Sequence, residues 1–270
     1  MDFVEANGLR FAYLSEGEGP LVLLVHGFPD TAHTWDHVMP RIAEKGYRAV
    51  APFLRGYHPT EVPAADADGL TIGRDVLGLI DALGDGEPAI VIAHDWGASA
   101  AYAAASLEPE KVARLFIVAI PHPSTIKPSL GKLWGVRHFF AYKLPGAAKR
   151  FAKDDFAALP AIYQRWSPAW SPDPSEFEAT RECFSHPESL EAAFGYYRAL
   201  ELSPPKYLKA KLPMDTVCFA GTDDPIVTPA DYHAAKRMFT GAYTVETMPG
   251  GHFLHREHPD TFAELLLKHL

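Results

Sequence analysis

The sequence predicts an α/β fold in which helices cover both faces of a mostly parallel sheet, with one helical insertion. Two observations predict it. Continuous apolar runs, typical of strands that are buried on both faces, alternate with segments of helical periodicity. This alternation stops after residue 121 and resumes at residue 213. We therefore expect a core domain of residues 1–121 and 213–270, with a helical lid, or cap domain, of residues 122–212 inserted in it.

The first part of the core begins with a predicted hairpin. Alternating apolar residues flank Asn7 and Gly8, a pair that favours the tight turn of a hairpin. The apolar runs predicted to form buried strands after it are residues 21–27, 47–53, 88–95 and 112–120. The helices expected between these strands cover residues 31–46, 70–83 and 97–107.

The insertion, residues 122–212, has no run that resembles a buried strand. Aromatic residues, prolines and short helical patterns fill it instead. The α/β alternation then resumes, with strands expected at 214–221 and 242–250 and helices at 229–239 and 259–270. Because the insertion follows a strand, we expect it to cover the carboxyl edge of the sheet, where such sheets bind ligands.

Composition narrows the class of protein. The chain has 270 residues, of which 47% are hydrophobic, so one large domain can bury a full core. The net charge of −9 argues against nucleic acid or an anionic membrane surface as a partner. Cys183 and Cys218 suggest no disulfide framework. The start resembles no signal peptide, and no apolar run approaches the roughly 20 residues of a membrane span, so we expect a soluble cytoplasmic protein.

The stretch PAIVIAHDWGASAAYAAA, residues 88–105, carries the strongest chemical signal. Asp95 lies where the predicted strand ends and the helix begins, and Ala93 and Gly97 are the small neighbours that so tight a corner needs. Such a corner is typical of a nucleophile elbow, which usually has serine at its tip. Asp95 could instead cap the N-terminus of the helix, as an aspartate before a helix commonly does.

Two later segments favour the nucleophile. An attacking carboxylate forms an ester, and hydrolysis of that ester needs a base, normally a histidine oriented by a second carboxylate. Asp223 and Asp224 follow one predicted strand, and His252 follows the next. Both loops therefore lie at the ligand edge of the sheet, in the chain order nucleophile, acid, base that hydrolases of this architecture show.

With these residues in place, the chain resembles the α/β-hydrolase family. Within it, the chain is similar to the branch of epoxide hydrolases and haloalkane dehalogenases, whose nucleophile is an aspartate. The resemblance covers nearly all of the chain, and five segments carry it in the family's order: HGFP at 26–29, RGY at 55–57, HDWGAS at 94–99, GTDDP at 221–225 and GGHF at 250–253.

The resemblance implies a role for each matching residue. Asp95 corresponds to the nucleophile and His252 to the base. The family's acid lies three residues after the glycine of its motif, which here is Asp224. The backbone amides of Phe28 and Trp96 would form the oxyanion hole.

Epoxide hydrolases also hold the epoxide oxygen with two acidic donors from the lid, commonly two tyrosines. Tyr197, in the segment FGYYRAL, resembles the second donor. The first donor normally lies seven residues before a proline, and counting back from Pro145 leads to His138 rather than to a tyrosine. Tyr142 in the same segment is the alternative. A His/Tyr pair occurs in some epoxide hydrolases and also at the halide site of fluoroacetate dehalogenases.

The resemblance predicts hydrolysis of a small apolar epoxide to a vicinal diol through an ester on Asp95. A dehalogenase with the same nucleophile is one alternative, and a non-catalytic ligand-binding receptor on the same scaffold is another. No arginine that could clamp fluoroacetate lies between Asp95 and Arg114. Phe28 stands where haloalkane dehalogenases often have asparagine. A homodimer stays open.

A zinc site is a further alternative, because His252, His255 and His258 recur every three residues. Pro259 and the two glycines before His252 argue against one helix that presents all three imidazoles. We therefore expect no metal, and the chemistry that the resemblance implies needs no organic cofactor.

Overall fold

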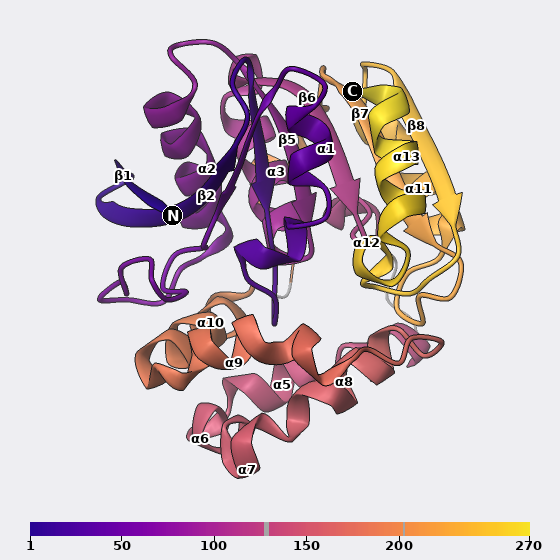
Figure 1. Cartoon of the computed structure of the whole chain (residues 1–270). Helices are drawn as coiled ribbons and strands as arrows, with labels where there is room; N and C mark the ends of the chain where they lie inside the picture. The colour runs from indigo at the N-terminus through magenta and orange to yellow at the C-terminus, as the bar shows by residue number, and fades with distance from the viewer. Residues whose placement is uncertain (127–129, 202) are drawn as a thin grey trace.

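The computed structural model of the chain describes residues 1–126, 130–201 and 203–270. Its core is an eight-stranded sheet with the order β1-β2-β4-β3-β5-β6-β7-β8. β2 pairs antiparallel with β1 and β4, and every pairing from β4 through β3 to β8 is parallel. Figure 1 shows helices against both faces of this sheet and a separate layer of helices beneath it. The predicted α/β fold with a mostly parallel sheet is confirmed.

All the apolar runs that predicted strands lie in the sheet. The eight strands are β1 (Asp2–Ala6), β2 (Leu9–Glu16), β3 (Leu21–Val25), β4 (Arg48–Pro52), β5 (Ala89–His94), β6 (Val112–Val118), β7 (Asp215–Gly221) and β8 (Tyr243–Met248). The predicted hairpin turns at Asn7 and Gly8, which both have positive φ. Every residue of β3 and β5 is buried, as expected for central strands covered on both faces.

The helices of the core are α1 (Met39–Ala43), α2 (Gly69–Leu83), α3 (Trp96–Leu107), α11 (Pro229–Ala235), α12 (Leu254–Glu257) and α13 (Pro259–His269). The helix predicted over residues 31–46 is wrong. A 3₁₀ turn (Ala32–Trp35) and the short α1 stand there instead. Pro40 explains the break, because a proline has no N–H to donate and is tolerated only in the first turn of a helix.

Every described element between β6 and β7 is helical. The α-helices are α4 (Leu130–Gly135), α5 (His138–Lys143), α6 (Ala147–Phe151), α7 (Lys153–Phe156), α8 (Ala158–Trp166), α9 (Glu178–Ser185) and α10 (Pro187–Ala199). Short 3₁₀ turns accompany them at η3 (Pro123–Thr125), η4 (Pro174–Phe177) and η5 (Lys206–Lys209). We keep the name helical insertion for residues 122–212, whose bounds stay a prediction.

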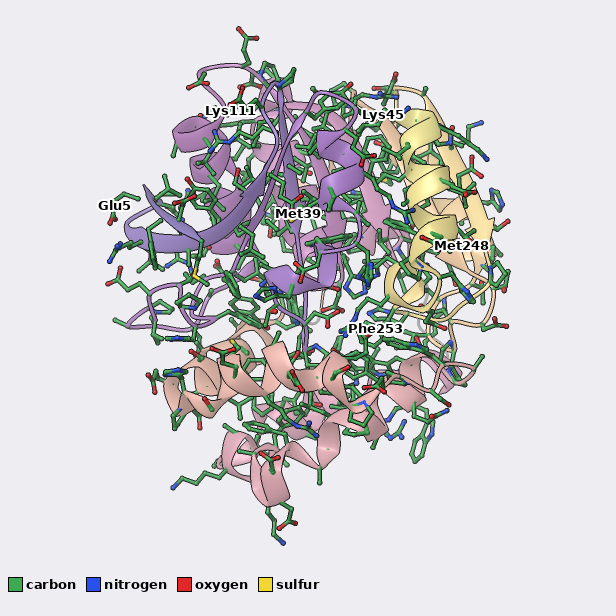
Figure 2. All side chains as sticks on the ribbon, viewed as in Figure 1. Glu5, Met39, Lys45, Lys111, Met248 and Phe253 are labelled. Carbon is green, nitrogen blue, oxygen red and sulfur yellow. The ribbon has the colours of Figure 1, made fainter. Side chains whose placement is uncertain are left out.

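The helical insertion contacts the sheet at the carboxyl ends of its strands. The ring of Phe28, just after β3, lies 5.4 Å from the ring of Tyr142 in α5 and 5.5 Å from that of Tyr197 in α10. Figure 2 shows Phe253, which precedes α12, at the junction between the core and the insertion. Throughout the described ranges, no helix is long and apolar enough to cross a membrane.

Candidate active site

Asp95 lies at the corner between β5 and α3, in a strained backbone conformation with φ 50° and ψ −116°. The corner is possible because its neighbours are glycines. A Cβ on Gly97 would lie 2.2 Å from the carbonyl oxygen of Val25, and a Cβ on Gly27 would lie 2.4 Å from the Cβ of Asp95. The Asp95 carboxylate accepts no hydrogen bond from the first amides of α3, so it does not cap that helix.

The carboxylate of Asp95 meets the two groups that the sequence placed near it. The amide of Phe28 donates to its Oδ1 at 2.9 Å. Its Oδ2 lies 3.3 Å from Nε2 of His252, which follows β8. On the other side of the ring, Nδ1 of His252 lies 3.3 Å from Oδ2 of Asp224, which follows β7. One buried imidazole thus lies between two carboxylates.

The two adjacent aspartates after β7 have different surroundings. Asp224 is buried, and its Oδ1 accepts hydrogen bonds from the amides of Ile226 at 2.7 Å and Val227 at 3.2 Å. Asp223 is exposed and accepts a bond from the Gly250 amide at 3.2 Å. Asp224 is therefore the carboxylate that contacts and orients His252.

Burial and nearby charge act in opposite directions on the pKa values of His252 and Asp95. Burial alone would lower the pKa of His252, but hydrogen bonds to Asp224 and Asp95 outweigh it and raise that pKa. Burial alone would raise the pKa of Asp95, but the His252 imidazole and the Phe28 amide outweigh it and lower that pKa. At neutral pH the resting pair is therefore a carboxylate and an imidazolium.

Both amides of the expected oxyanion hole are close to Gly27. A Cβ on Gly27 would lie 2.5 Å from Oδ1 of Asp95 and 2.8 Å from the amide nitrogen of Trp96. The Phe28 amide, next along the chain, already donates to Oδ1. The absence of a side chain at position 27 thus lets these groups approach one another.

Aromatic side chains of the helical insertion face the carboxylate. Tyr197 of α10 is buried, and its ring lies 5.1 Å from that of Trp96. His138 of α5 is also buried, with its ring 5.7 Å from that of Tyr197. Among the described residues, Nδ1 of His138 has no hydrogen-bond partner. A backbone interaction with Gly135 nevertheless contributes to the pKa of His138.

The two candidates for the first donor, His138 and Tyr142, differ in their electrostatic contact with the nucleophile. Burial lowers the pKa of His138 to about 3, and the charge of Asp95 partly opposes this. Burial and then Asp95 raise the pKa of Tyr197. Burial also raises the pKa of Tyr142, but there the opposing charge is Arg165. The field of Asp95 is thus felt at His138 and Tyr197.

The contacts that hold the segment around His252 were not predicted from the sequence. The carbonyl of Trp166, at the end of α8, accepts from the His252 amide at 2.9 Å. Ser167 Oγ accepts from the Phe253 amide at 3.1 Å and donates to Glu257 at 2.5 Å. The ring of Trp166 also lies 5.3 Å from that of His252. No local pattern signals these bonds, because the partners are far apart in the chain.

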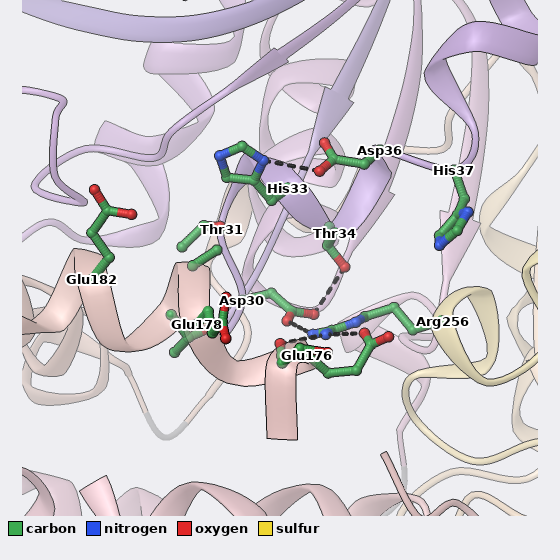
Figure 3. Close-up of a pocket in the computed structure, with 13 residues that line it drawn as sticks. Asp30, Thr31, His33, Thr34, Asp36, His37, Glu176, Glu178, Glu182 and Arg256 are labelled. Atoms are coloured by element: carbon green, nitrogen blue, oxygen red, sulfur yellow. Dashed lines mark hydrogen bonds and ion pairs between the residues drawn. The ribbon is translucent and has the colours of Figure 1, made fainter. Parts of the chain in front are cut away.

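Arg256 joins the helical insertion to the core behind His252. Its guanidinium forms ion pairs with Asp30 after β3 and, at 2.6 Å, with Glu176 in η4. Asp30 also accepts a hydrogen bond from the hydroxyl of Tyr163 in α8 at 2.6 Å. Figure 3 shows Arg256 between its two carboxylates in the wall of a pocket of about 410 Å³. The residues that line this pocket do not include Asp95 or His252.

One group of side chains has the spacing of metal ligands. Within the described part of the chain, ligand atoms of Asp30, His94 and His255 lie within 4.8 Å of one another. Asp30 is already neutralised by Arg256, which a divalent cation would have to displace. The contacts therefore fit a hydrogen-bonded network better than a metal site. The imidazole of His252 contacts two carboxylates and His258 is exposed, so these two do not fit the zinc alternative that the spacing of the histidines suggested.

Comparison with known proteins agrees with this fold. A sequence model described as alpha/beta hydrolase fold matches residues 20–259. The chain belongs to the alpha/beta hydrolase family.

This α/β hydrolase has relatives along its whole length. It is 30% identical to AB hydrolase superfamily protein YfhM of Bacillus subtilis, over 99% of this chain and 96% of that protein. It is also 30% identical to Epoxide hydrolase 3 of Mus musculus, over 97% of this chain and 74% of that protein.

Solved structures of similar fold include an epoxide hydrolase from Bacillus megaterium in complex with an inhibitor. The TM-score is 0.86 at 21% identity, and the match covers 99% of each chain. An epoxide hydrolase from Vigna radiata matches with a TM-score of 0.84 at 25% identity, over 99% of this α/β hydrolase and 96% of that chain. The fold of this α/β hydrolase is therefore shared by enzymes of known structure.

Proposed function

We propose that this α/β hydrolase opens epoxides to vicinal diols through a covalent ester on Asp95. One observation carries the proposal. The Asp95 carboxylate, at a strained corner, lies 3.3 Å from an imidazole that a second carboxylate orients from the other side. Buried donors of the helical insertion lie near it, and relatives named epoxide hydrolases support the reaction class.

In the first step an oxygen of Asp95 bonds to an epoxide carbon. The C–O bond of the ring breaks, and its electron pair stays on the ring oxygen. The hydroxyl of Tyr197 and an N–H of His138 donate hydrogen bonds to that oxygen as charge develops on it. Burial favours this role, because it keeps the His138 imidazole neutral and the Tyr197 phenol protonated, so that each can donate.

The change of charge at Asp95 links the two steps. In the resting protein His252 is held as an imidazolium by two carboxylates. Once Asp95 is an ester its negative charge is gone, and with it one of the causes that raise the pKa of His252. The imidazolium then gives up its proton more readily, and the product alkoxide takes up one proton. His252 thus becomes a base after the ester has formed.

In the second step neutral His252, oriented by Asp224, removes a proton from water. The water oxygen bonds to the ester carbonyl carbon of Asp95, and the amides of Phe28 and Trp96 stabilise the resulting oxyanion. The bond between the Asp95 carboxyl carbon and the alcohol oxygen breaks, that oxygen takes up the proton of the new Asp95 carboxyl group, and the diol leaves with Asp95 again a carboxylate and His252 again an imidazolium. One epoxide and one water are consumed for each diol formed.

The role of Tyr197 is tested with the adjacent tyrosine as a control. The Tyr196 hydroxyl donates to the carbonyl of Arg55 at 2.8 Å and is thereby directed away from the proposed reaction centre. We expect Tyr197→Phe to lower kcat/KM for styrene oxide by about 100-fold or more, the usual effect of losing a donor to a developing oxyanion. Tyr196→Phe should change it far less, and equal effects of the two variants would contradict the assignment.

The reaction class is tested with a panel of styrene oxide, aliphatic epoxides, haloalkanes and fluoroacetate. We expect diol from the epoxides and no halide release. Halide release without diol would instead support a dehalogenase that uses the same Asp95. Reversible epoxide binding without diol would support a receptor.

We also propose that the protein acts in the cytoplasm. Both cysteines, Cys183 and Cys218, are free and buried, a state that a reducing compartment maintains. Fractionation of the source cells tests this, because recovery from the culture medium or an extracytoplasmic compartment would contradict it.

A further inference from the structure

The net charge of −9 is divided unevenly between the core and the helical insertion. Residues 122–212 contain 13 Lys and Arg against nine Asp and Glu, a formal charge of +4, and the remaining residues carry −13. Residues 122–153 contain no Asp or Glu. Figure 1 shows the insertion beneath the core, so the molecule has a basic side and an acidic side.

The acid-free stretch also carries the large apolar side chains that the insertion exposes. Trp134 is 70% exposed, and Phe140 and Leu144 are each 58% exposed. Residues of this size are usually buried, and three of them close together in sequence form an apolar surface that nothing in the described structure covers.

These side chains project from one face of α4 and α5. A short turn links the two helices: the Val136 amide donates to the carbonyl of Lys132 at 2.9 Å, and the Phe139 amide donates to the carbonyl of Val136 at 2.9 Å. Positions 134, 137, 141 and 144 follow helical spacing, and 140 lies beside them. His138 and Tyr142, on the other side of α5, are buried toward the proposed reaction centre. We call the opposite side, made by residues 134, 137, 140, 141 and 144, the outer face.

The cations at this face have no carboxylate partner within the ranges that the structure describes. Arg137 on this face, and Lys143 and Arg165 beside it, form no ion pair there, although the Lys143 ammonium donates to the carbonyl of Leu200 at 2.9 Å. The Arg137 guanidinium lies over the ring of Trp134 at 4.5 Å. Burial and then the charge of Arg137 lower the pKa of Arg165. The outer face thus combines apolar side chains with uncompensated positive charge.

The charge of −9 led us to expect no anionic membrane as a partner, but the helical insertion is positively charged, and we propose that its outer face docks on the surface of an anionic lipid bilayer. Trp134, Phe140 and Leu144 would enter the interface between head groups and acyl chains, where tryptophan is favoured. Arg137 and Lys143 would attract anionic head groups. The acidic core would then point away from the membrane. This contact lies on the surface and needs no spanning helix, and it is independent of the reaction proposed above.

The charge of the outer face favours a membrane over a second copy of the chain as its partner. A two-fold dimer through the outer face would bring Arg137 and Lys143 of both copies together, because the same patch lies on each side of such an interface. Like charges repel across that contact, whereas an anionic bilayer neutralises them. A homodimer, which the sequence leaves open, is therefore not expected to use this face.

The experiment measures co-sedimentation of the purified full chain with vesicles. We expect binding to vesicles of phosphatidylcholine mixed with phosphatidylglycerol, little binding to phosphatidylcholine alone, and loss of binding as salt is raised. The triple variant Trp134→Ser/Phe140→Ser/Leu144→Ser should reduce the partition coefficient at least tenfold. Phe3→Ser, which removes a 43% exposed aromatic from the core, is the matched control and should bind as the original chain does.

A charge variant separates the electrostatic part of the contact. Arg137→Glu should weaken binding to the anionic vesicles, whereas Arg237→Glu, an exposed position on the core, should not. Far-UV circular dichroism melts confirm that all variants fold. No binding to anionic vesicles, or equal binding by the triple variant and the original chain, would overturn the proposal. So would a dimer in light scattering that the triple variant dissociates.

Discussion

Replacing His252 by Gln should change how stability depends on pH as well as abolish turnover. In the folded protein Asp224 and Asp95 outweigh the effect of burial, and the pKa of His252 rises from its ordinary 6.5 to about 10. Between these two values the folded state binds one more proton than the unfolded state. The stabilisation from His252 is therefore complete below pH 6.5 and is lost as pH rises toward 10.

The magnitude follows from this single proton. The free energy of unfolding should fall by about 1.4 kcal/mol per pH unit, or about 3 kcal/mol between pH 7 and pH 9, through His252 alone. His252→Gln should lack this component, whereas His258→Gln, an exposed position on the same segment, should retain it.

Urea unfolding at pH 7, 8 and 9 measures the slopes of all three proteins. Taking the difference between the original chain and His252→Gln cancels other groups that titrate in this range. Parallel stability curves for these two proteins would refute the geometry in which one imidazolium lies between Asp95 and Asp224.

Two further substitutions test the surroundings of the site. Arg256→Met should destabilise the protein by about 3 kcal/mol, because it leaves the buried Asp30 carboxylate without its cation. Arg41→Met, at an exposed ion pair, should cost about 1 kcal/mol or less. Urea unfolding measures the stability of both variants. Gly27→Ala places a Cβ 2.4 Å from the Cβ of Asp95 and should lower kcat/KM by about 100-fold or more, since misplacing a reacting group by about 1 Å has effects of that size.

The control for Gly27→Ala is a glycine with free space around it. Among the described residues, and leaving aside its own helix backbone, no heavy atom lies within 4 Å of a Cβ built on Gly131 in α4. Gly131→Ala should therefore leave activity unchanged and raise stability slightly through helix propensity. Full activity of Gly27→Ala would contradict the close approach of β3 and the corner at Asp95.

The sequence predicted the sheet well because its central strands are buried on both faces and therefore read as continuous apolar runs. The corner at Asp95 was also recognisable, since small residues flank it at the spacing that a strand-to-helix turn requires. His252 and Asp224 could be placed at the same edge from the rule that carboxyl ends of parallel strands lie together. These features depend on local patterns that repeat along the chain.

Other features depend on contacts that no local pattern records. The helix expected over residues 31–46 failed because hydrophobic spacing outweighed Pro40 in the prediction. The bond from the His252 amide to the Trp166 carbonyl joins distant parts of the chain, and backbone groups carry it, so side-chain identity gives no signal. The ion pairs of Arg256 likewise join distant parts of the chain: Asp30 lies in the first part of the core and Glu176 in the insertion.

The isotope content of the first product tests the ester on Asp95 most directly. Excess protein is mixed with a smaller amount of styrene oxide in water enriched in ¹⁸O, and the diol of a single turnover is analysed by mass spectrometry. We predict an unlabelled diol, because its new oxygen comes from the Asp95 carboxylate, and ¹⁸O in the peptide that contains Asp95. A labelled diol with an unlabelled peptide would contradict the covalent route, since water would then have attacked the epoxide itself.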